Sequence, residues 1–133
     1  MQAYELGLSW RLLGPDRDEI LLYVLYIAQK MGHNLVERRK LSRILYGLRT
    51  RTKFPVKYRF GKSADPESSD VNLDLLDLFV CGFTREHLDL KGPIYELTSF
   101  GKSYVESYVS PRLSVFEQSV ADEVANMAWE CSK

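Results

Sequence analysis

The sequence predicts one mainly helical domain that carries a small β-hairpin, an α+β fold. Apolar residues recur at helical spacing over most of the chain, and two short strand-like runs surround the turn at Gly92-Pro93. With 133 residues, of which 45% are hydrophobic and 27% are charged, the chain has the size and composition of a single globular domain over residues 1–133.

A central helix is predicted from Arg17 to Met31. Asp16 and Glu19 have the spacing of a capping box before it, and Gly32 is a typical helix stop. The stretch 20–28 is apolar nearly all round, so this helix is expected in the core.

A second helix is predicted from about Leu35 to Leu48, because Asn34 and Glu37 repeat the capping spacing. Its apolar stripe consists of Leu41, Ile44, Leu45 and Leu48. Basic residues lie opposite or beside that stripe and are expected to face solvent. After this helix, the apolar residues Phe54, Val56, Tyr58 and Phe60 alternate with proline, basic residues and glycine, which predicts a short strand or an extended arm. The stretch from Lys62 to Asp70 is rich in Ser, Asp and Pro, which predicts an exposed loop.

The remaining elements are a third helix, a hairpin and two further helices. The third helix is expected from Val71 to Gly82, and the hairpin strands over 83–88 and 94–97. Thr98 is expected to cap a helix over 99–109, in spite of Gly101 inside it. An amphipathic helix over about 111–131 closes the chain, and its apolar stripe consists of Leu113, Phe116, Val120, Val124, Met127 and Cys131.

Three stretches resemble a known family: "RRKLSRILYGL" after the first helix, the "LLDLFVCGF" helix-to-strand turn, and "YELTSFGKSYVE". The last has the Y-x-L-T-x-x-G pattern common among winged-helix regulators. From about 16 to 109 the chain resembles the YwgA-like and antitoxin-associated winged-helix proteins of prokaryotes, with the C-terminal helix as an addition. The resemblance implies a winged-helix core, in a family that includes DNA-binding regulators, antitoxin-like proteins and members without known activity.

Two departures from that family bear on function. The loop "GKSADPESSD" replaces a short G-P-Y-S-like turn, and the third helix carries Asp70, Asp74 and Asp77. Carboxylates repel the phosphates that line a DNA groove, so they weigh against sequence reading by the third helix.

Charge is strongly segregated along a chain whose net charge is zero. Residues 36–62 hold ten basic residues and one acidic residue, 10 − 1 = +9, whereas residues 63–90 hold one basic and seven acidic residues, 1 − 7 = −6. A basic lobe of this kind can steer a polyanion even when the total charge is nil.

The function expected from this lobe is that of a non-enzymatic DNA-binding transcriptional regulator. Its partner would be duplex DNA, with RNA as a further ligand, and Tyr46 or Tyr58 would stack or form hydrogen bonds. The predicted nucleic-acid-binding residues are Arg38, Arg39, Arg43, Tyr46, Arg49, Arg51, Lys53, Lys57, Arg59 and Lys62.

Two alternatives remain open at this stage. The basic residues can instead pair with the acidic third helix of the same or another subunit, or the charged helices can dock a partner protein in the manner of an antitoxin. The C-terminal stripe is expected to form a homodimer interface through Leu113, Phe116, Val120, Val124 and Met127, and its alternative is to pack over the first helix as core.

No cofactor, metal site or catalytic residue is expected. His33 and His87 are better explained as solvated or capping residues, and an acidic helix surface is a commoner reason for Asp74 and Asp77 than a metal site. Two distant cysteines, no secretion signal and a longest apolar run of nine residues predict a reduced, cytoplasmic protein without a membrane span.

Overall fold

The fold is mainly helical with a small antiparallel sheet, which confirms the α+β class that the sequence predicts, but the sheet has three strands where the sequence predicts a two-stranded hairpin. The computed structural model describes residues 16–54, 56–58, 60, 68–90 and 92–127. Its elements are α2 (Arg17–Lys30), β1 (Val36–Glu37), α3 (Arg38–Arg51), α4 (Ser69–Val80), β2 (Thr84–Asp89), β3 (Gly92–Leu97), α5 (Ser99–Tyr104), the π-helical turn η1 (Val105–Val109), α6 (Ser110–Leu113), the 3-10 turn η2 (Ser114–Phe116) and α7 (Glu117–Asn126).

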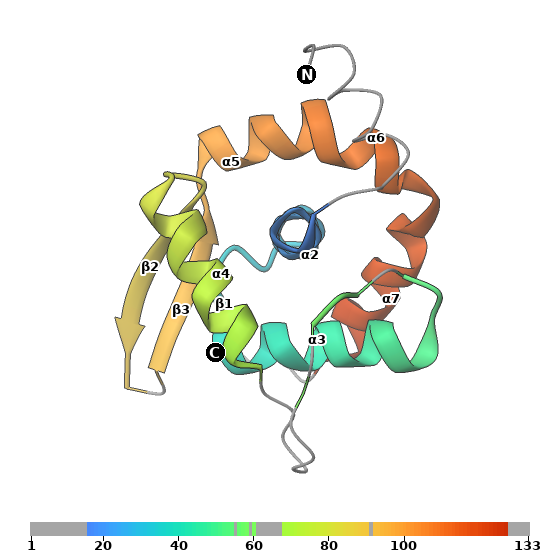
Figure 1. The fold of residues 1–133 in the computed structure, drawn as a ribbon, viewed down its shortest axis with the longest axis horizontal. Coiled ribbons are helices and arrows are strands. Elements are labelled where there is room, and N and C mark those ends of the chain that lie inside the picture. The colour runs from blue at the N-terminus through green and yellow to red at the C-terminus, as the bar shows by residue number, and fades with distance from the viewer. Residues whose placement is uncertain (1–15, 55, 59, 61–67, 91, 128–133) are drawn as a thin grey trace, which may run out of the picture.

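Helix α2 is the centre of the molecule. Figure 1 looks along its axis and shows α3, α4, the sheet, α5, α6 and α7 arranged around it. Every residue from Ile20 to Ala28 is at most 7% exposed, which confirms that this helix is buried on all sides. The capping box of Asp16 and Glu19 is also present, with the Asp16 amide donating to Glu19 Oε1 at 2.9 Å.

The second helix begins later than predicted. Val36 and Glu37 form β1, which pairs with Tyr95 and Ile94 of β3, and α3 starts only at Arg38. The predicted cap at Asn34 is therefore wrong, because pairing in the sheet uses the residues that would have formed the first helical turn. The strand order is β1-β3-β2, so β3 is central.

The hairpin lies close to its predicted position, but Gly92 and Pro93, which are predicted in the turn, belong to β3 and pair with Asp89 and Leu88. The hairpin is held against the helices at two glycines. Gly82 has φ +86°, a conformation that L side chains rarely adopt, and it turns the chain from α4 into β2. Gly101 lies inside α5, where a Cβ atom would sit 2.2 Å from the Phe83 carbonyl oxygen. The glycine that interrupts the predicted helix is thus required by the close approach of α5 to the backbone before β2.

The C-terminal helix is segmented and packs inward. Leu113, Val120 and Val124 are at most 1% exposed, and Phe116 and Met127 pack against the same core. The prediction that these five residues form a homodimer interface is therefore wrong for the three buried ones, since a side chain already enclosed in one chain cannot contact a second. The alternative, packing over α2, is what the structure shows. Cys131 lies outside the described residues.

Gly101→Ala is expected to destabilise the protein by about 1 to 3 kcal/mol, because the added methyl group meets a backbone carbonyl that cannot move alone. Thermal unfolding followed by circular dichroism measures the loss. Ser103→Ala, at an exposed position of the same helix, is the control and should change stability by less than about 0.5 kcal/mol. Equal stability of the two variants would contradict the close approach.

Candidate nucleic-acid interface

The exposed side of α3 carries the centre of the predicted basic surface. Arg39, Arg43 and Tyr46 are exposed, while the four residues of the predicted apolar stripe are fully buried. The spacing i, i+4, i+7 aligns these three side chains along one side of the helix. This confirms the prediction that these three side chains lie on the side of α3 opposite the apolar stripe.

Two further arginines lie on the flanks of α3, and each binds a different neighbour. Arg49 Nη1 donates to the Tyr58 carbonyl oxygen at 2.5 Å. Arg51 forms a two-point ion pair with Glu123 of α7, with Nη2–Oε1 at 2.6 Å and Nε–Oε2 at 3.1 Å. A Cβ atom on Gly47 would lie 2.2 Å from Glu123 Oε1, so the absence of a side chain there leaves room for the paired Glu123 and Arg51 side chains.

The segment after α3 is an extended arm rather than a strand in its described residues 52–54, 56–58 and 60. Phe54 and Tyr58 are buried, whereas Lys53 and Lys57 are exposed. Phe60 packs edge-on to Tyr46, with the ring centroids 5.5 Å apart. The arm therefore continues the cationic surface of α3 through its two lysines.

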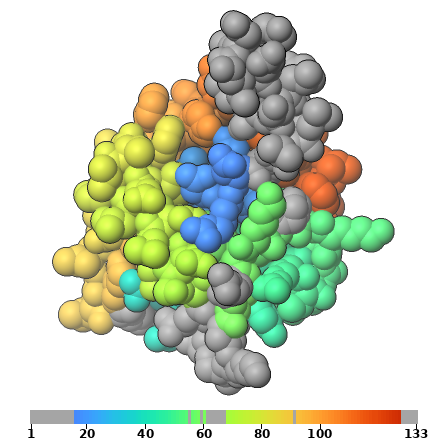
Figure 2. Space-filling view, in the orientation of Figure 1, coloured from blue at the N-terminus to red at the C-terminus, as the bar shows by residue number. Residues whose placement is uncertain are grey.

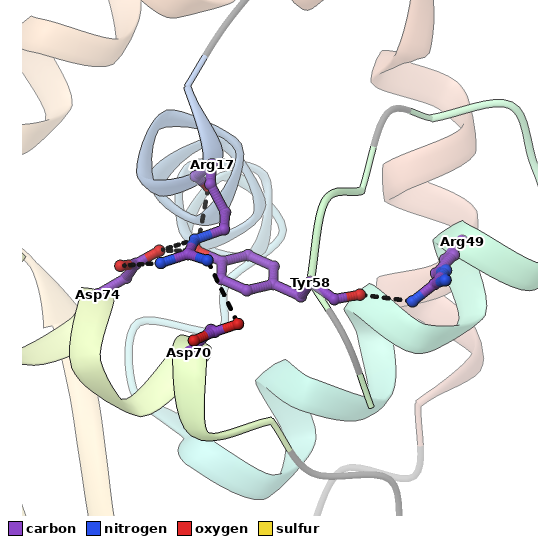
Figure 3. A network of polar contacts seen from close by, with 5 residues as sticks. All are labelled: Arg17, Arg49, Tyr58, Asp70 and Asp74. Atoms are coloured by element: carbon purple, nitrogen blue, oxygen red, sulfur yellow. Dashed lines mark hydrogen bonds and ion pairs between the residues drawn. The ribbon is translucent and has the colours of Figure 1, made fainter. Parts of the chain in front are cut away.

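A polar network fixes the arm to the two helices beside it (Figure 3). Arg17, the first residue of α2, donates from Nε to Asp74 Oδ2 at 2.8 Å and from Nη2 to Asp74 Oδ1 at 3.0 Å, and its Nη1 lies 3.3 Å from Asp70 Oδ2. The Tyr58 hydroxyl donates to Asp74 Oδ2 at 2.6 Å. The Arg17 guanidinium also lies over the Tyr58 ring, 5.1 Å from its centroid.

This network changes the role expected for Tyr58 and Asp74. Burial and the hydrogen bond to Asp74 raise the pKa of Tyr58 well above its usual value of 10.0. Tyr58 is an anchor of the arm, so the prediction that it is available to stack on a ligand is wrong. Asp74 binds Arg17 and Tyr58, while Asp77, one turn along α4, is exposed.

The other predicted contact residues divide into two groups. Arg38 is half-buried and lies beside Tyr95. Burial of Tyr95, and after it the hydrogen bond to Glu86, raises the pKa of this tyrosine to about 12, while the positive charge of Arg38 opposes the rise. Arg59 and Lys62 lie outside the described residues, as does most of the predicted loop.

Sequence reasoning missed the network of Arg17, Tyr58 and Asp74. A signal for Asp74 is present, because its spacing from Val71, Leu75 and Leu78 puts it on the buried side of α4. A carboxylate on a buried side needs a cation or several hydrogen bonds. Nothing in the sequence shows that Arg17, 57 residues away, supplies the cation.

Other kinds of site find little support in the described part of the chain. His87 Nε2 lies 3.1 Å from Glu96 Oε1 on the exposed hairpin. Within residues 16–127, leaving aside the gaps stated above, no three His, Cys, Asp or Glu side chains are grouped so that they could hold a metal ion. None of the helices described there has the length and apolar character that crossing a bilayer requires.

Comparisons with family models, curated proteins and solved structures found no match to this chain.

Asp74→Asn is expected to lower the free energy of unfolding by about 1.5 to 3 kcal/mol, the range for hydrogen bonds to a charged group. The lower end is expected, because the Arg17 side chain is 37% exposed and water can partly replace its partner. Urea unfolding measures the loss. Asp77→Asn removes the same charge from an exposed site of the same helix and should leave stability nearly unchanged; equal losses in both variants would contradict the network.

The stabilising contribution of the Tyr58 hydroxyl is expected to disappear at alkaline pH. The folded protein keeps this phenol protonated, whereas the unfolded chain releases the proton near pH 10, so the contribution is complete below that pH and is lost as pH rises above it. Tyr58→Phe should therefore be less stable than the parent at pH 8, and the difference should shrink by pH 11. Urea unfolding at both pH values is the measurement, and a constant difference would contradict the raised pKa.

Proposed function

We propose that the protein is a non-enzymatic nucleic-acid-binding module of the winged-helix type. The order of its elements supports this class: a buried helix, a short strand, two helices and a two-stranded wing follow one another as α2, β1, α3, α4 and β2-β3. The short strand pairs with the inner strand of the wing. The class rests on this order and on the sequence motifs.

The observation that carries the proposal is the exposure of six cationic side chains on α3 and on the described part of the arm. These side chains are Arg39, Arg43, Arg49, Arg51, Lys53 and Lys57. Long basic side chains held at fixed positions on a rigid helix and an anchored arm suit contacts to successive phosphates.

The proposed mode of binding is contact with the phosphate backbone and little reading of bases. In a winged-helix domain, the helix before the wing is the one placed to read a groove, as the second helix of a helix-turn-helix does. Here that helix is α4, which has no lysine or arginine and exposes Asp77. Sequence preference should therefore be weak.

Binding to random duplex DNA and duplex RNA, measured by fluorescence anisotropy, is expected to weaken steeply with salt. If six cations contact phosphates, the slope of log affinity against log salt should be about −5. Arg39→Glu with Arg43→Glu should abolish measurable binding above about 100 mM salt, because two attractive contacts become repulsive.

The matched control is Arg85→Glu with Lys102→Glu, which makes the same change of charge at exposed positions away from α3. It should retain the affinity and salt slope of the parent. Absence of binding at low salt, or equal loss in both double variants, would overturn the proposal.

A further inference from the structure

Helix α4 is apolar on two sides, and one of them faces solvent. Val71, Leu75 and Leu78 are buried, but the opposite side exposes Leu73, Leu76, Phe79 and Val80 by 44% to 74%. A group of large apolar side chains exposed together on a helix is typical of a surface that binds another molecule. The outward side of α4 therefore has the character of an interface.

The hairpin beside α4 carries two further exposed leucines. Leu88 shares a face of β2 with Thr84 and Glu86, because side chains alternate along a strand, and this is the face of the sheet that bears the buried Tyr95. Leu88 is 84% exposed, Leu90 at the turn is fully exposed, and α4 packs beside β2. We name the six exposed residues Leu73, Leu76, Phe79, Val80, Leu88 and Leu90 the α4-wing surface.

This surface is separate from the basic one. Figure 2 shows α4 and the hairpin to the left of the first turn of α2, and α3 to its lower right. Segment 69–90 carries five acidic residues and one basic residue, 1 − 5 = −4. Arg17 offsets one of these charges through Asp70 and Asp74, so an acidic character remains.

The negative charge of the α4-wing surface repels the phosphates of nucleic acid, which excludes nucleic acid as its ligand. The same charge disfavours binding to a second copy of this chain. Two copies meeting through the same surface would bring two surfaces of negative charge together, even after the charge of Arg17 is counted. The basic side of α3 in another copy would offer cations to the α4-wing surface. It lacks apolar groups that could pack against the exposed leucines, because the apolar stripe of α3 is fully buried, namely Leu41, Ile44, Leu45 and Leu48.

We propose that the α4-wing surface binds an amphipathic helix of a partner protein, with an apolar stripe flanked by lysine or arginine. Leu73, Leu76 and Val80 repeat at i, i+3 and i+7, the spacing by which one helix packs along another. Asp77 on α4 and Asp89 at the end of β2 are exposed and would face the flanking cations of the partner. This binding does not depend on the basic surface of α3.

The test uses the full chain and three synthetic fluorescent peptides of about 18 residues, a length that matches the 12 residues of α4 with a turn to spare at each end. The first has a leucine stripe at helical spacing flanked by lysines, the second has the same stripe flanked by glutamates, and the third has the composition of the first with the stripe scrambled. Only the first is expected to bind, and its affinity should fall as salt rises.

Leu76→Lys with Val80→Lys should weaken binding of the first peptide by at least about 10-fold, because exposed interface anchors become charged and repel its lysines. Leu35→Lys with Val115→Lys is the control, since both residues are exposed apolar side chains on other elements. Thermal unfolding should be the same for both variants, because none of the four side chains is in the core.

Three outcomes would overturn the proposal: no binding of the striped lysine peptide at millimolar concentration, equal binding of the scrambled peptide, or equal loss in the two double variants. Concentration-dependent dimers in sedimentation that the Leu76→Lys and Val80→Lys variant abolishes would assign the surface to a second copy instead.

Discussion

The rest of the structure depends on one constraint, namely that α2 has no polar side between Ile20 and Ala28. A helix that is apolar all round must be covered all round. Figure 1 shows the result, a ring of elements from the sheet through α5 to α7 and α3. The C-terminal helix is one of these covering elements, which explains why Leu113, Val120 and Val124 of its apolar stripe are core residues.

Polar groups at the first turn of α2 orient this cover. Arg17 binds Asp70 and Asp74 of α4, and the same Asp74 accepts the hydroxyl of the arm. The neighbouring Glu19 is buried and accepts hydrogen bonds from Tyr104 at 2.5 Å and from Arg112 at 2.8 Å. A single helical turn thus holds α4, the arm, α5 and α6, because Arg17 is shared by α4 and the arm and the buried charge of Glu19 requires partners from α5 and α6.

The anchoring of the arm links the core to the proposed function. With Phe54 and Tyr58 inside, the lysines that alternate with them face outward beside α3. The sequence suggested that carboxylates of the third helix pair with the basic helix. In the structure, Asp70 and Asp74 bind Arg17 of α2 instead. Arg51 of α3 binds Glu123 of α7.

Patterns that act over short distances were sufficient to predict the fold class, the buried α2, the apolar stripe of α3 and the hairpin. Local spacing alone determines which side of a helix is apolar and where a capping box or a glycine turn lies. The start of α3 and the fate of the C-terminal stripe were mispredicted because both depend on distant partners, β3 for Val36 and Glu37, and α2 for Val120 and Val124. The exposure of Arg39 and Arg43 was predictable, but the anchoring role of Tyr58 was not, since its partner lies 16 residues further along the chain.

The most direct test of the central claim, that α3 and the arm form a phosphate-binding surface, is to map amide chemical shifts of the labelled full chain as duplex DNA is added. We predict that the shifts concentrate at Arg39, Arg43 and Tyr46 and along the arm at Lys53 and Lys57, with α4 and the hairpin unchanged. Shifts confined to α4 and the hairpin, or no shifts at low salt, would contradict it.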